Sequence, residues 1–173
     1  MKLFMTILLP LILLVNIHAS DDIIDNDVSV GYGSSVEDID IYRISLKKDL
    51  NPYFFEKRYK FLPKYYEGSF GYWEGKNGKG LVNLSFTPVF RYTNTDLFNV
   101  DPFIEGGLGA TYISKSKLQD ENFGQNFQFE SFIGIGVKTD NFEFTYRYMH
   151  YSNLVHEHNS GVTLGFISIT YSF

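Results

Sequence analysis

The feature that most constrains this 173-residue chain is an alternation of apolar and polar residues with a period of two. Successive side chains of a β-strand point to opposite faces, so the alternation predicts strands that each have one apolar face. Eight segments show it: Val28–Ser34, Ile39–Lys48, Tyr66–Trp73, Leu81–Tyr92, Phe103–Ile113, Phe127–Val137, Phe142–Ser152 and Val162–Phe173. The composition agrees, because 17 Phe and 13 Tyr bring the aromatic content to 18%, and aromatic residues favour strands.

The connections between these segments are defined unevenly by the sequence. The Asn-Gly pair at 77–78 is the strongest short signal for a hairpin turn. Residues 114–125 form a long polar connection and residues 139–141 a short one. The aromatic and basic stretch Asn51–Lys64 fits either a long connection or a strand extension. Pro88 cannot donate a ladder hydrogen bond, so it predicts a bulge or a strand end.

The polar faces of the predicted strands are charged, and this leaves two architectures open. The charged residues on these faces are Arg43, Glu67, Arg91, Glu105, Glu130, Glu143 and Arg147. A soluble, lipocalin-like barrel buries its apolar face, whereas a membrane barrel turns that face toward lipid and keeps a polar interior. In the membrane barrel, the basic and acidic side chains would have to pair with one another, because an unpaired buried charge is costly.

Three cues favour the membrane. Tyr and Phe gather toward the strand ends, as interfacial girdles require, and the chain allows each strand about ten residues, the spanning length. The chain also ends in Ile167, Ile169, Tyr171 and Phe173 at period two, which resembles the recognition signal of outer-membrane barrels. We therefore expect an all-β fold, an eight-stranded antiparallel transmembrane β-barrel. Its interior would be filled by side chains, so a pore is not expected.

The N-terminal segment predicts export. MKLFMTILLPLILLVNIHA has a Lys near its start, an apolar run and Ala19 before acidic residues, the pattern of a cleaved signal peptide. A membrane anchor is the alternative, but Pro10 and the shortness of the apolar run argue against it. The expected organisation is a signal peptide over residues 1–19 and an outer-membrane barrel over residues 20–173. A net charge of -5 excludes a basic surface for nucleic acid, and the lack of cysteine excludes thiolate chemistry.

Candidate chemistry gathers where the segment Phe142–Ser152 ends. If Glu143 and Arg147 point inward, then His150 and Ser152 point outward, toward lipid. With the N-terminus in the periplasm, this seventh strand would end at the outer leaflet. A serine becomes a nucleophile when a histidine base activates it, and these two residues lie two positions apart on one face of the strand. The alternative is that His150 and Ser152 are non-catalytic interfacial side chains bonded to lipid headgroups.

A metal site is a further alternative for the same region. His150, His156 and His158 lie within nine positions of one another and could bind Zn²⁺. Histidines in a single loop rarely form a defined site, so we expect neither a metal nor another cofactor.

Several motifs resemble those of the PagL-type lipid A 3-O-deacylases, whose members are often called acyloxyacyl hydrolase-like. The most specific is Tyr146–Asn153, YRYMHYSN, followed by Asn159-Ser160-Gly161. Tyr72–Glu74, Thr87–Tyr92 and Phe127–Glu130 are similar to the third, fourth and sixth strands of that family. The resemblance implies an eight-stranded outer-membrane barrel that hydrolyses the ester-linked acyl chain at the 3-position of lipid A. Its partner would be the lipopolysaccharide of the outer leaflet, and a homodimer is left open.

The same resemblance implies roles for individual residues. His150 matches the general base and Ser152 the nucleophile, while Asn153 and Asn159 match supporting or oxyanion positions. Thr163 stands where the family's best-known pattern has a Glu that orients the histidine. Glu157 is the other acid near this position, although the spacing does not show that it reaches His150. The alternative function is a non-catalytic structural or adhesive barrel that has lost the acid.

Overall fold

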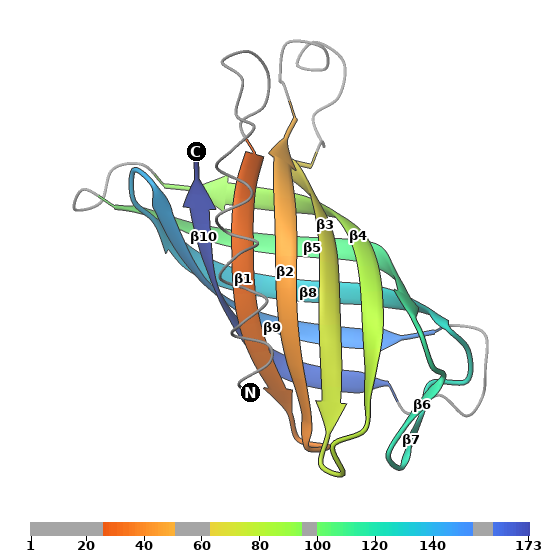
Figure 1. Ribbon diagram of the computed structural model, residues 1–173. Helices are drawn as coiled ribbons and strands as arrows, with labels where there is room; N and C mark the ends of the chain where they lie inside the picture. The colour runs from red at the N-terminus through yellow and green to blue at the C-terminus, as the bar shows by residue number, and fades with distance from the viewer. Residues whose placement is uncertain (1–25, 51–62, 95–99, 154–160) are drawn as a thin grey trace.

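The chain forms a closed antiparallel β-barrel in the computed structural model, which describes residues 26–50, 63–94, 100–153 and 161–173 (Figure 1). The strands are β1 Asn26–Ser35, β2 Ile39–Asp49, β3 Tyr65–Gly75, β4 Gly80–Thr93, β5 Asp101–Ile113, β6 Lys117–Leu118, β7 Glu121–Asn122, β8 Phe127–Lys138, β9 Phe142–Ser152 and β10 Val162–Ser172. The barrel order is β1-β10-β9-β8-β5-β4-β3-β2, and β1 pairs with β2 to close it. Within the described ranges, no helix is long and apolar enough to cross a membrane.

The structure confirms the eight predicted strands and corrects two details. A short hairpin of β6 and β7 lies within the stretch expected to be a polar connection. The bulge or strand end predicted at Pro88 is wrong, because β4 runs through it. Phe86 pairs with Ala110 and Val89 with Gly107, so the register of β4 with β5 is the same on both sides of the proline. Most of Asn51–Lys64 lies outside the described residues.

The outer surface of the barrel is apolar. Ile133 is 68% exposed and Leu108 64% exposed, and they belong to a belt that runs over β4, β5, β8, β9 and β10. A soluble barrel would bury these side chains, so their exposure excludes the lipocalin-like alternative. The apolar faces of the strands therefore point to lipid, and the chain is a transmembrane barrel.

The interior at the end where β1 begins and β10 finishes is an ionic network. Its basic members are Arg43, Lys47, Arg91 and Arg147, and its acidic members are Glu67, Glu105, Glu130 and Glu143. Glu67 binds two arginines, at 2.9 Å from Arg43 and 2.8 Å from Arg147. Each of these side chains is paired, and all are buried except Arg91, which is partly buried. Pairing is the condition under which charges are tolerated away from water.

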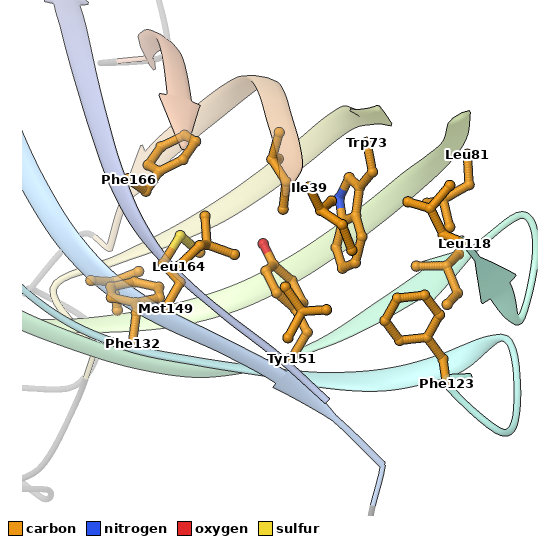
Figure 2. Close-up of a cluster of buried hydrophobic side chains, with 14 of the residues drawn as sticks. Ile39, Trp73, Leu81, Leu118, Phe123, Phe132, Met149, Tyr151, Leu164 and Phe166 are labelled. Atoms are coloured by element: carbon orange, nitrogen blue, oxygen red, sulfur yellow. The ribbon is translucent and has the colours of Figure 1, made fainter. Parts of the chain in front are cut away.

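The interior at the other end is an apolar core (Figure 2). Trp73 lies at its centre, with its ring edge-on to Tyr151 at 4.7 Å and to Phe123 at 5.7 Å between ring centroids. Gly31 lets Phe166 approach the wall, since a Cβ at that glycine would lie 2.3 Å from the Phe166 ring. This end of the barrel is therefore packed solid by side chains.

The β6–β7 hairpin closes the mouth of this end. Leu118 and Phe123 point from the connection that carries the hairpin into the apolar core, and both are buried (Figure 2). Gln119 reaches across the mouth, where its Nε2 donates a hydrogen bond to the carbonyl of Asp38 in the β1–β2 turn at 3.2 Å. The connection between β5 and β8 thus acts as a plug, and we call residues 114–126 the plug.

Candidate active site

The site lies at the end of β9, on the outer wall. Glu143 and Arg147 of β9 are buried in the ionic network, with exposures of 1% and 2%. Phe144, Tyr146 and Tyr148 on the opposite face of the strand are exposed. His150 and Ser152 are half-buried on this outward face. The orientation predicted from the period of the strand is therefore the orientation found.

Thr163 is the cross-strand neighbour of His150 on β10. His150 Nδ1 lies 2.7 Å from Thr163 Oγ1, a distance at which the two atoms form a hydrogen bond. The position where an acid was expected is thus occupied by a hydroxyl that orients the imidazole ring. Because Nδ1 is engaged by this hydroxyl, Nε2 is the ring nitrogen that remains for proton transfer.

Gly161, the last residue of the Asn159-Ser160-Gly161 motif, lies beside Nε2 of His150. Its φ is +63°, which favours glycine. Extending the β9–β10 register by one residue places Gly161 opposite Ser152. A Cβ at Gly161 would lie 3.0 Å from His150 Cε1 and 3.4 Å from Nε2. A side chain at this position would therefore crowd the Nε2 side of the His150 ring, and glycine avoids that contact.

His150 and Ser152 are the residue types that ester hydrolysis uses, and both lie on the outward face of the barrel. No hydrogen bond joins His150 to Ser152 among the hydrogen bonds of residues 26–50, 63–94, 100–153 and 161–173. Catalytic hydrogen bonds are often long before substrate binds, so this does not disqualify the pair. The Nδ1–H···Oγ1 arrangement would leave Nε2 as an acceptor, which is the protonation state that a general base needs.

The remaining expected site residues divide into two groups. Asn153 is buried, and its Nδ2 donates a hydrogen bond to the carbonyl of Phe123 in the plug. This contact supports the strand end, while an oxyanion role for Asn153 stays a prediction. The positions Glu157, Asn159, His156 and His158 lie outside the described residues. Within the described ranges, no group of three or more metal-ligating side chains comes together.

Comparisons with known proteins agree with one another. A family model described as lipid A 3-O-deacylase (PagL) matches residues 42–172. The lipid A deacylase PagL of Pseudomonas aeruginosa is 35% identical over 129 residues, which cover 73% of this chain and 74% of that protein. The lipid A deacylase PagL of Bordetella bronchiseptica is 35% identical over 107 residues, covering 59% of this chain and 58% of that protein. A crystal structure of the outer membrane enzyme PagL superposes with a TM-score of 0.70 at 30% identity, covering 83% of this chain and 97% of that one.

Proposed function

Because the chain belongs to the lipid A 3-O-deacylase (PagL) family of ester hydrolases, we propose that it removes the ester-linked acyl chain at the 3-position of lipid A. The observation that carries the proposal is the outward pair His150 and Ser152, with His150 Nδ1 held at 2.7 Å from Thr163. Both side chains face the bilayer, where an acyl ester is present, and not the filled interior.

In the proposed reaction, Ser152 Oγ attacks the ester carbonyl while His150 Nε2 takes the serine proton. The tetrahedral intermediate then collapses, the sugar oxygen leaves with the proton from Nε2, and the acyl group stays on Ser152. A water molecule, deprotonated by His150, then attacks the acyl-serine. The fatty acid leaves, and His150 returns the proton to Ser152 Oγ. The negative oxygen of each intermediate needs donors, for which we propose the Asn159 amide and a backbone N–H next to Ser152.

Thr163 takes the orienting role of the missing acid in this proposal. Its hydroxyl accepts a hydrogen bond from Nδ1–H both when the imidazole is neutral and when it carries the extra proton. It cannot supply the negative charge that stabilises an imidazolium, so the chemical step should be slower than with a carboxylate. The proposed catalytic group is therefore a Ser152–His150 dyad. Thr163 orients the histidine as the acid of a triad would, but it carries no negative charge.

The proposed location follows from export and topology. Residues 1–19 act as a cleaved signal peptide, and the barrel inserts in the outer membrane with its termini in the periplasm. β1 and β9 run in the same direction, so β9 then ends at the outer leaflet, where lipopolysaccharide resides. The substrate reaches Ser152 sideways from the leaflet. The homodimer stays a prediction. The mass of the detergent-solubilised protein would show whether it is a monomer or a dimer.

Mass spectrometry of lipid A from cells that express the chain tests the proposal. We expect a species that has lost one 3-position acyl chain in cells with the wild-type protein and its absence in cells with Ser152→Ala. The variant must reach the membrane folded, which the mobility of unheated samples on SDS gels reports. Identical lipid A in the two strains would contradict the enzyme and favour the non-catalytic barrel, for which the loss of the acid at position 163 is the argument.

A further inference from the structure

The nucleophile occupies a poorly supported position in the sheet. Ser152 is the last residue of β9 and pairs with Phe129 of β8 on one side. On the other side, the last pair of the β9–β10 ladder joins Tyr151 to Val162, so Ser152 lies beyond it. Strand ends with few cross-strand partners open more easily than strand centres. Catalysis needs reacting groups held to within about 1 Å, so something else must fix this end.

The two sequence neighbours of Ser152 point inward, and both are held there. The Tyr151 hydroxyl accepts a hydrogen bond from Arg43 Nη1 at 3.0 Å, and its ring packs edge-on against Trp73. On the other side of Ser152, the Asn153 amide donates to the carbonyl of Phe123. The outward serine is therefore flanked by two inward anchors, one to the barrel wall and one to the plug.

The plug end of the second anchor is itself fixed. Gln128 Nε2 donates to the same Phe123 carbonyl at 3.0 Å and to the Gln125 carbonyl at 2.6 Å. The Phe123 ring is fully buried and lies edge-on to Trp73. Phe123 thus presents to Asn153 a carbonyl that lies in the buried interior and also accepts a hydrogen bond from Gln128.

We propose that Asn153 and Phe123 form a clamp through which the plug positions Ser152 for attack. The inference rests on the proposed esterase function, and it adds that a connection far from the ester is needed for its rate. Asn153 is then a positioning residue that acts through Ser152, whether or not its backbone also meets the substrate. Phe123 is one as well, although it lies 29 positions upstream.

The test uses full-length protein folded in detergent micelles with purified lipid A. Variants Asn153→Ala and Phe123→Ala should lower kcat about 10- to 100-fold and leave KM within about twofold, because positioning is lost while substrate binding is retained. Phe123→Leu, which keeps the apolar anchor, should recover most of the rate. The double variant should lose no more than the worse single variant, as expected for two members of one clamp. Phe103→Ala removes a buried aromatic at the opposite end of the barrel and serves as the control for general destabilisation.

Hydrogen exchange at residues 150–153 gives a readout that does not depend on catalysis. We expect about tenfold faster exchange there in Asn153→Ala and Phe123→Ala, and wild-type exchange there in Phe103→Ala. Unchanged exchange would overturn the clamp even if the wild-type protein proved inactive, whereas faster exchange in an inactive protein would support the clamp and overturn only the esterase. Faster exchange in a variant that keeps the wild-type kcat would also overturn the clamp. A loss of kcat in Asn153→Ala alone would assign that residue to the oxyanion and overturn the role of Phe123.

Discussion

At the scale of single residues, three positions around Ser152 define what the site can do. In the proposed reaction His150 supplies the base. Thr163 Oγ1 lies 2.7 Å from its Nδ1, and Gly161 places no side chain against its Nε2. The first two could be predicted from the period of β9 and from motif resemblance. Gly161 belongs to the motif Asn159-Ser160-Gly161, but its place beside the His150 ring could not be predicted, because it depends on the register of β10 against β9, which sequence spacing across a loop does not determine.

Thr163 offers a direct test of the orienting hydroxyl. Thr163→Val keeps the shape of the side chain and removes the hydrogen bond, so kcat should fall about tenfold or more, because the imidazole is no longer held. Thr163→Glu should raise kcat above wild type, since a carboxylate would stabilise the imidazolium. Steady-state rates of lipid A deacylation by the folded protein measure both effects.

The control for Thr163 comes from the other neighbour of His150. Ser131 pairs with His150 from β8, on the side away from Thr163. Ser131→Ala should leave kcat near the wild-type value. If Thr163→Val retained full activity, the hydroxyl would have no part in orienting the base.

At the scale of elements, the strands could be predicted and the plug could not. Alternation defines a strand because each barrel strand has one face in lipid and one face inside. The plug has no such periodicity, since Leu118 and Phe123 are the two side chains that enter the core from an otherwise polar connection. The prediction of a bulge or strand end at Pro88 was wrong for a related reason. β4 continues through it with an unchanged register, because β3 pairs with β4 at Pro88 itself and β5 pairs with β4 on both sides of the proline.

The inward faces of the strands yield a prediction about stability. Glu67→Gln removes the carboxylate shared by Arg43 and Arg147, so it leaves two buried cations short of a partner. Breaking a buried ion pair from one side typically costs about 3–5 kcal/mol. We expect a loss of that size in the free energy of unfolding, measured by urea titration of the protein in lipid vesicles.

An exposed ion pair provides the comparison for Glu67. Asp38 and Lys76 pair at 2.7 Å between two turns at the plugged end, with both side chains largely exposed. Asp38→Asn should change the free energy of unfolding little, because solvent screens such pairs. Equal losses in Glu67→Gln and Asp38→Asn would mean that the interior network does not stabilise the barrel.

At the scale of the whole molecule, the barrel is inverted relative to a soluble protein. Charges pair inside at one end, and the outer wall is apolar. An apolar core and the plug fill the other end (Figure 2). Alternation alone could not show which face of each strand lies in lipid. The aromatic strand ends and the terminal Phe173 indicated that the apolar face does. The inversion has a functional consequence, because a side chain on the outer wall meets lipid. His150 and Ser152 are on that wall, so the proposed substrate is a lipid of the same membrane that surrounds the barrel.

The central claim is that Ser152 is a nucleophile activated by His150 on the lipid-facing wall. Treating the folded protein with a fluorophosphonate and mapping the adduct by peptide mass spectrometry tests this claim most directly. We predict one adduct on the peptide that carries Ser152, no adduct in Ser152→Ala, and a slower reaction in His150→Ala. A folded wild-type protein that gains no adduct, or gains one at another residue with Ser152 unmodified, would contradict the account.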